Sequence, residues 1–65
     1  MKKIQVRAIR TKLGMSQSEF STRYQITLRT LQQWEQGRRE PEGAVLAYLR
    51  VIERNPELVR ETLEL

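Results

Sequence analysis

The stretch from Leu28 to Gln36 carries side chains that suit hydrogen bonding to the edges of DNA bases. Leu31, Trp34 and Glu35 fall on the inward side of a helix, which leaves an outer face of Leu28, Arg29, Thr30, Gln32, Gln33 and Gln36. Arginine and glutamine make bidentate contacts to guanine and adenine, and an apolar leucine can touch the methyl group of thymine. A polar face without a carboxylate therefore favours DNA reading over a merely solvated face.

The charge of the chain is distributed unevenly over its 65 residues, whose net charge is +4. Residues 1–39 contain nine Lys or Arg and two Glu, whereas residues 40–65 contain three Arg and six Glu. A basic first part with an acidic second part is typical of a protein with one face for a polyanion and another for a different task. The alternative is a charge excess that only improves solubility.

Most catalytic and metal-binding chemistry is excluded by the residue types that the chain lacks. It has no cysteine, histidine or aspartate, so disulfides, zinc fingers and Ser-His-Asp or Asp-Asp catalytic sites are impossible. The glutamates do not have the spacing of a metal site, and we expect no metal, no cofactor and no enzyme activity. No apolar run is long enough for a transmembrane helix.

Capping residues predict two short helices joined by a tight turn, and the second of these helices carries the outer face. Ser16 and Glu19 have the spacing of a capping box, which predicts a helix over residues 17–24. Thr27 is a candidate N-cap for the next helix, which should stop at Gly37. The turn of residues 24–27 is too short for antiparallel packing, so we expect a helix-turn-helix unit over about residues 17–36.

Three further helices complete the predicted fold. Apolar residues at helical spacing predict one over about residues 2–13, ended by Gly14, and another over about residues 43–54. Asn55 followed by Pro56 predicts the start of a fifth helix, which reaches the C-terminus at residues 55–65. We therefore expect a single all-α domain of five short helices over residues 1–65.

Two charged residues fall on predicted core faces. Arg10 shares a helix face with Val6 and Leu13, and Glu35 lies on the same face as Leu31. An isolated buried charge is very costly, so each of these residues needs a partner. We predict an Arg10–Glu35 ion pair with a structural role between the first and third helices.

The last predicted helix carries more apolar surface than one packing contact needs, in Leu58, Val59, Leu63 and Leu65. Helix-turn-helix proteins read two-fold DNA sites as dimers. We therefore expect an isologous homodimer interface, formed by Leu58, Val59 and Leu63 with Tyr48 and Ile52. The alternative is a monomer in which this helix only covers the core.

Two motifs of the chain resemble those of a known family. They are Leu13-Gly14-Met15-Ser16-Gln17-Ser18-Glu19-Phe20 and Trp34-Glu35-Gln36-Gly37-Arg38-Arg39-Glu40-Pro41. Together they resemble the Xre (Cro/C1-type) helix-turn-helix family over about residues 5–54, which implies a lambda-repressor-like fold. With the tail of residues 49–58, the chain is most similar to the DNA-binding domains of antitoxins of the HigA, MqsA and NadS type.

The resemblance implies a function. Antitoxins of these types are dimeric transcriptional repressors of their own toxin–antitoxin operons, and they neutralise the toxin through another part of the chain. It thus implies a palindromic double-stranded DNA operator, a homodimer, a possible cognate toxin and a bacterial, cytoplasmic and nucleoid-associated location. We also expect the chain to be a DNA-binding domain from a longer protein.

The resemblance assigns roles to individual residues as well. In it the third helix reads the major groove, with Arg29 and Gln33 as the first base-contacting residues and Leu28, Thr30 and Gln32 as further candidates. Contacts to the DNA backbone, which position a protein without specifying sequence, fall to Gln17, Thr27, Arg38 and Arg39. The chain departs from many members in the turn, where Gln25 replaces glycine and predicts a strained left-handed residue.

Two other functions stay open from the sequence. A protein-interaction adaptor or toxin-binding module on the same scaffold, without base readout, would bind duplexes with steep salt dependence and no sequence preference. An enzyme such as a nuclease would need magnesium held by glutamates or a Lys–Glu pair, and the sequence shows no such cluster.

Overall fold

The computed structural model describes residues 5–64, and over this range the chain forms five α-helices and no strand. The helices are α1 (Val6–Lys12), α2 (Gln17–Tyr24), α3 (Leu28–Glu35), α4 (Gly43–Arg54) and α5 (Pro56–Leu63). The all-α prediction is confirmed. The helix expected over residues 2–13 is present at residues 6–12, and residues 2–4 lie outside the described range. None of the described helices has the length and apolar character needed to cross a membrane.

The helix ends follow local capping chemistry. The Ser16 hydroxyl accepts from the Glu19 N–H at 3.1 Å, and the Glu19 carboxylate accepts from the Ser16 N–H at 3.0 Å, which completes the predicted capping box. Gly14 and Gly37 follow α1 and α3 with φ angles of +69° and +76°, the left-handed conformation that ends helices. Asn55 precedes α5 as predicted, but its side chain makes no capping hydrogen bond.

The core contains side chains from every helix. Those that are fully buried belong to Phe20, Tyr24, Leu31, Leu49 and Ile52. They are joined by Val6, Ile9, Ile26 and Val59, which are also buried. Trp34 was expected in the core but is only partly buried, and it packs against the edge of this cluster. The burial of large aromatic and aliphatic side chains supplies the main stabilisation of so short a chain.

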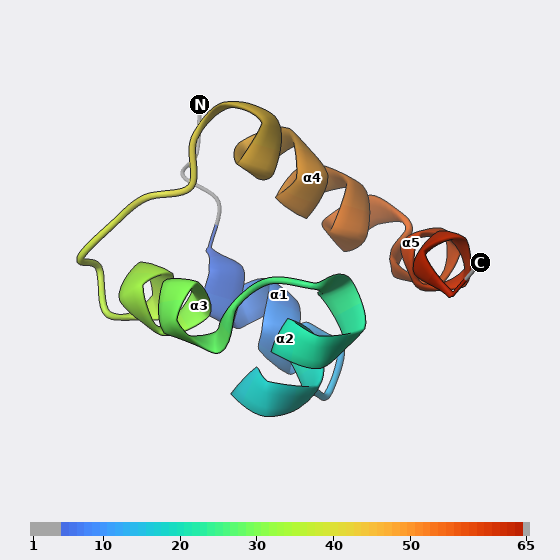
Figure 1. Ribbon diagram of the computed structural model, residues 1–65, viewed down its shortest axis with the longest axis horizontal. Helices are drawn as coiled ribbons and strands as arrows, with labels where there is room; N and C mark the ends of the chain where they lie inside the picture. The colour runs from blue at the N-terminus through green and yellow to red at the C-terminus, as the bar shows by residue number, and fades with distance from the viewer. Residues whose placement is uncertain (1–4, 65) are drawn as a thin grey trace.

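The helices are arranged so that α3 and α5 lie at opposite ends of the molecule. Figure 1 shows α4 lying over the group formed by α1, α2 and α3, with α5 following it after a bend. Helix α3 packs against α1 and α2, whereas α5 packs against α2 and α4. The side of α3 that faces away from these neighbours is therefore available to a ligand.

The turn between α2 and α3 is held by hydrogen bonds around one strained residue. Gln25 has a φ of +57°, a conformation that costs a non-glycine residue about 1–2 kcal/mol. The Ser21 hydroxyl donates to the Ile26 carbonyl, and the Ile26 N–H donates to the Ser21 carbonyl at 3.1 Å. From α4, the Tyr48 hydroxyl donates to the Tyr24 carbonyl at 2.7 Å. These bonds fix the turn, and with it the placement of α3 relative to α2.

Candidate nucleic-acid interface

Helix α3 begins at a side-chain cap that also orders its first turn. The Thr27 hydroxyl accepts from the Thr30 N–H at 3.3 Å, so Thr27 is the N-cap that the sequence predicts. The same hydroxyl donates to the Thr30 hydroxyl at 2.7 Å. Leu31, one position further, is fully buried. The start of α3 is thus held to the core by Leu31 on one side and capped by the Thr27 hydroxyl on the other.

The outer face of α3 is most accessible at its two ends. Leu28, with 38% of its surface exposed, and Arg29 lie open in the first turn, and Gln36 is exposed after the last. Thr30, Gln32 and Gln33 are half-buried. The structure therefore brings the predicted base-contacting residues onto one helix, with Arg29 the most accessible of the polar ones. Their contacts with bases stay a prediction.

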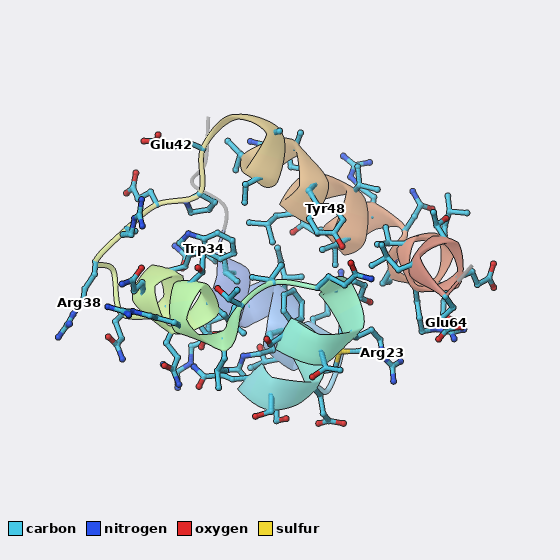
Figure 2. All side chains as sticks on the ribbon, viewed as in Figure 1. Arg23, Trp34, Arg38, Glu42, Tyr48 and Glu64 are labelled. Atoms are coloured by element: carbon cyan, nitrogen blue, oxygen red, sulfur yellow. The ribbon has the colours of Figure 1, made fainter. Side chains whose placement is uncertain are left out.

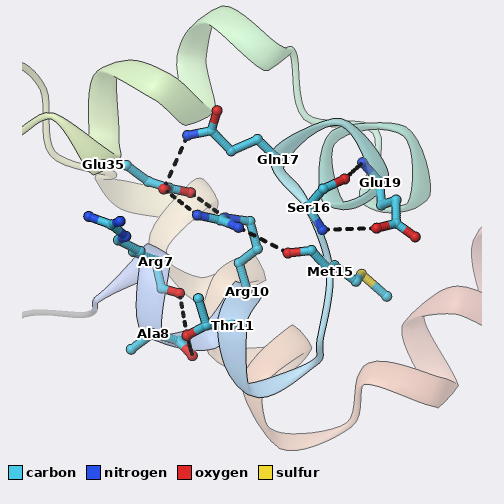
Figure 3. Close-up of polar contacts among 9 residues, drawn as sticks. All are labelled: Arg7, Ala8, Arg10, Thr11, Met15, Ser16, Gln17, Glu19 and Glu35. Carbon is cyan, nitrogen blue, oxygen red and sulfur yellow. Dashed lines mark hydrogen bonds and ion pairs between the residues drawn. The ribbon is translucent and has the colours of Figure 1, made fainter.

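An ion pair joins the end of α3 to α1. Nε and Nη2 of Arg10 each donate to one oxygen of Glu35 at 2.8 Å, which makes the contact bidentate (Figure 3). The side chains are only 13% and 5% exposed, so the pair is shielded from water, as the sequence predicts. Nη1 of Arg10 also donates to the Met15 carbonyl at 2.9 Å. Arg10 thereby ties α3 to the segment that leads into α2.

Gln17 takes part in this network, which sequence reasoning missed. Its side-chain Nε2 donates to Glu35 at 3.2 Å, and the side chain is half-buried (Figure 3). One amide hydrogen of Gln17 therefore stabilises a carboxylate within the domain. The contact of Gln17 with a DNA phosphate stays a prediction, with its backbone N–H in the first turn of α2 as a suitable donor.

The two arginines after α3 extend from a loop whose start is fixed. The N–H groups of Arg38 and Arg39 both approach the Gln33 carbonyl, at 2.9 and 3.4 Å, while Gly37 donates to the Trp34 carbonyl at 3.2 Å. The side chains of Arg38 and Arg39 are exposed, and Figure 2 shows Arg38 pointing away from the domain. They are available to a phosphate backbone beside α3, which is the role predicted for them.

The described residues offer no site for a metal ion. They contain no group of three or more acidic, histidine or cysteine side chains that could hold one. A shallow depression lined by Ser18, Glu19, Thr22 and Arg23 lies along a single helix, and one open helix face does not enclose a small molecule. The polar surface of α3 and the loop after it is the stronger candidate for a functional site.

Acid is expected to destabilise the domain through Glu35 and Glu19. Hydrogen bonds from Arg10 hold the pKa of Glu35 below its ordinary value, and those from Ser16 lower the pKa of Glu19. A lowered pKa stabilises the folded chain above the unfolded pKa of about 4.3, and this stabilisation is lost as the pH falls through the folded pKa.

Urea unfolding followed by circular dichroism would measure this dependence between about pH 7 and pH 2. We expect the free energy of unfolding to decrease below about pH 4.3 in the parent chain. The decrease should be smaller in Glu35→Gln, because the amide at position 35 takes up no proton in this pH range. An equal decrease in both proteins would show that Glu35 does not carry the effect.

The residues predicted for a dimer interface do not share one exposed surface. Ile52 is fully buried and Val59 is 7% exposed, so both belong to the core of a single chain and their assignment to an interface is wrong. Tyr48 and Leu63 are half-buried and pack against the same core. Figure 2 shows Tyr48 extending from α4 toward α2. Leu58 is the member of the set that is open, with 59% of its surface exposed; Leu65 lies outside the described residues.

The chain is similar to helix-turn-helix proteins in sequence and in structure. A family model described as helix-turn-helix matches residues 6–55. The antitoxin HigA-2 of Vibrio cholerae serotype O1 is 36% identical over 58 residues, which cover 89% of this chain and 56% of that protein. The chain thus spans little more than half the length of this relative.

A solved structure has nearly the same extent as this chain. It is the crystal structure of an XRE-family-like helix-turn-helix protein from Agrobacterium tumefaciens, which superposes with a TM-score of 0.89 at 46% sequence identity. The match covers 91% of this chain and 95% of the other. The two proteins therefore share the same overall fold.

Proposed function

The chain belongs to the Xre-type helix-turn-helix family of DNA-binding regulators, and from this premise we propose that it is a sequence-specific transcriptional repressor. A homodimer binds a palindromic operator, with α3 of each copy in the major groove. Because the chain is similar to HigA-2, we further propose that it is the DNA-binding part of an antitoxin that represses its own operon. Its partners are then double-stranded DNA and a cognate toxin, in the cytoplasm of a bacterium and at its nucleoid.

The outer face of α3 is the observation that carries this proposal. Leu28 and Arg29 are exposed in the first turn, and the first residues of a recognition helix are those that reach base edges. The acidic residue of α3, Glu35, is turned inward onto Arg10. The outer face therefore presents donors and acceptors to DNA without a carboxylate that would repel phosphates.

Groups that suit phosphate contacts flank this face on both sides. Thr27 lies exposed at the start of α3, and Arg38 and Arg39 lie exposed beyond its end. Gln17 opens α2, whose first N–H groups favour an anion. We propose that these four residues hold the DNA backbone and so set the register in which Arg29 and Gln33, with Leu28, Thr30 and Gln32, meet the bases.

Selection from a pool of random duplexes tests the proposal. The purified chain is mixed with the pool at physiological salt, and bound duplexes are recovered, amplified and sequenced over several rounds. We expect an enriched palindrome whose half-sites lie about 10 base pairs apart, because two recognition helices must meet successive major grooves. Salt is held constant between rounds, since both specific and background binding weaken as it rises.

Recovery of bound duplexes without enrichment of any sequence would contradict base reading by α3. Binding that depends steeply on salt but on no sequence is what charge alone produces. The adaptor or toxin-binding module on a helix-turn-helix scaffold would then be the better description of the chain.

A further inference from the structure

The carboxylate of Glu35 joins three helices. Its oxygens accept from Nε and Nη2 of Arg10 on α1, each at 2.8 Å, and one of them also accepts from Nε2 of Gln17 on α2 at 3.2 Å. Glu35 itself belongs to α3. Only 5% of its side chain is exposed, so the carboxylate acts inside the domain and not directly on DNA.

The carboxylate determines which way the Gln17 amide lies. An ionised carboxylate accepts hydrogen bonds and donates none, so the amide nitrogen, and not the amide oxygen, must face it. Hydrogen bonds from Arg10 hold the pKa of Glu35 below its ordinary value, which keeps the group ionised at neutral pH. Figure 3 shows the amide oxygen of Gln17 directed away from Glu35. Nε2 carries two hydrogens, and Glu35 takes one, so the other is left for an acceptor outside this network.

The first turn of α2 adds backbone donors at the same residue. The N–H groups of Gln17 and Ser18 come before any acceptor within the helix, whereas the Glu19 N–H is taken by the Ser16 hydroxyl at 3.1 Å. Ser18 is exposed and Gln17 is half-buried. A phosphate at the start of α2 can therefore accept from the backbone and from the Gln17 side chain together.

A carboxylate so close to a phosphate would ordinarily repel it. Here Glu35 lies between two arginines. Arg10 binds it, and Arg7, which is exposed on α1, lies beside it and acts on it by its charge (Figure 3). Two cations against one anion leave this group of side chains with a net positive charge, which attracts a phosphate. A carboxylate can therefore hold Gln17 without placing an excess of negative charge beside the DNA backbone.

We propose that Glu35 is a positioning residue for DNA binding, which holds the Gln17 side chain so that the second hydrogen of Nε2 meets a phosphate. The proposal rests on the DNA-binding function proposed above, and it gives the Arg10–Glu35 pair a role besides stabilising the fold. Arg10 orients the carboxylate through its bidentate contact. Without Glu35, the long Gln17 side chain would have to be ordered by the phosphate itself, and the entropy lost in that ordering weakens the contact.

A double-mutant cycle in DNA affinity tests this role. Gln17→Ala is made in the parent and in Arg10→Met/Glu35→Leu, and fluorescence anisotropy measures the affinity of each protein for one duplex. In the parent we expect Gln17→Ala to lower the affinity by about tenfold, as for a hydrogen bond to a charged group. In the other background it should lower the affinity by less than about threefold, because Gln17 is no longer held. Equal losses in both backgrounds, or no loss in the parent, would overturn the proposal.

Arg38→Ala is the matched control. Arg38 is also a candidate for a phosphate contact, but its exposed side chain points away from the domain (Figure 2). We expect Arg38→Ala to lower the affinity by the same factor in both backgrounds. If the effect of Arg38→Ala also disappears without Arg10 and Glu35, the pair acts by placing α3 as a whole, and a specific role toward Gln17 is refuted.

A measurement on the parent chain covers the case in which Arg10→Met/Glu35→Leu does not fold. In nuclear magnetic resonance relaxation without DNA, the side-chain amide of Gln17 should be nearly as rigid as the backbone of α2, whereas that of the exposed Gln36 should be mobile. Addition of a duplex should then shift the Gln17 amide signals. A Gln17 amide as mobile as that of Gln36 in the free chain would contradict positioning by Glu35.

The cycle separates this role from sequence recognition, because a phosphate contact carries no base information. It can be measured with the selected palindrome or, at low salt, with an unselected duplex. A chain that selects no palindrome but shows the coupling between Gln17 and the pair would refute the repressor and keep the positioning role. A chain that selects a palindrome without this coupling would do the reverse.

Discussion

Replacing Glu35 with alanine is expected to lower the free energy of unfolding by about 3–5 kcal/mol. The reason is that Arg10, whose side chain is 13% exposed and bound bidentately to Glu35, would keep its charge without a partner. Gln17 would lose its acceptor at the same time. A domain of this size has a total stability of about 5 kcal/mol, so we expect between a few per cent and about half of the purified variant to be unfolded at room temperature.

Urea unfolding followed by circular dichroism would measure this loss, with Glu57→Ala as a control. Glu57 also forms an ion pair, to Arg60 at 2.7 Å, but its side chain is 75% exposed. Exposed pairs contribute only about 0.2–1 kcal/mol, so the control should unfold close to the parent. Similar losses of unfolding free energy in the two variants would show that shielding from water does not make the Arg10–Glu35 pair more stabilising than an exposed pair.

A double variant identifies the cause of the expected loss. In Arg10→Met/Glu35→Leu, both charges are replaced by apolar side chains, so no uncompensated charge remains in the partly buried site. Such replacements are often less harmful than the removal of one partner. We expect the double variant to be more stable than Glu35→Ala. A double variant as unstable as the single one would instead assign the loss to packing or to the bond from Gln17.

The helix boundaries could be predicted because they depend on residues close in the sequence. The capping box of Ser16 and Glu19, the cap at Thr27 and the glycines at positions 14 and 37 each act over one helical turn. The Arg10–Glu35 pair spans 25 positions, yet it was predictable because a charge on an apolar stripe requires a partner and the chain offers few.

The details that needed the structure are contacts between elements. Nothing in the local sequence of Gln17 shows that its amide turns toward Glu35, because a polar side chain at the start of a helix suits a phosphate equally well. Likewise Tyr48 could belong to the core or to an interface until its hydroxyl was placed on the Tyr24 carbonyl.

Helix α5 shows most clearly which packing contacts could not be predicted from the sequence. Its apolar residues fall on more than one side, so periodicity could not tell which of them the chain buries itself. The structure places Val59 in the core and leaves Leu58 open. The orientation of α5 is set by its packing against α2 and α4, and such packing is not visible in the helix's own sequence.

Replacing Arg29 and Gln33 together with alanine is expected to abolish the preference for the selected palindrome while leaving background DNA binding in place. Each bidentate contact to a base contributes about 1–3 kcal/mol of discrimination, so the double variant should lose about 2–6 kcal/mol in each half-site. Fluorescence anisotropy with the palindrome and a scrambled duplex of equal length would measure the loss as a ratio of affinities. Both residues belong to the outer face of α3, so the fold should be retained, and circular dichroism checks this.

The matched control is Arg38→Ala/Arg39→Ala, which removes two exposed charges from the loop after α3. If these arginines contact phosphates, affinity should decrease by a similar factor for both duplexes, and the slope of log affinity against log salt should become shallower by about 1 per arginine. The ratio of the two affinities should then stay close to that of the parent. Loss of the ratio in this control would assign part of the sequence recognition to the loop, and its persistence in Arg29→Ala/Gln33→Ala would show that these two residues do not read the bases. Loss of the affinity ratio in Arg29→Ala/Gln33→Ala, together with its retention in Arg38→Ala/Arg39→Ala, would assign base reading to α3 and positioning on the phosphates to the loop.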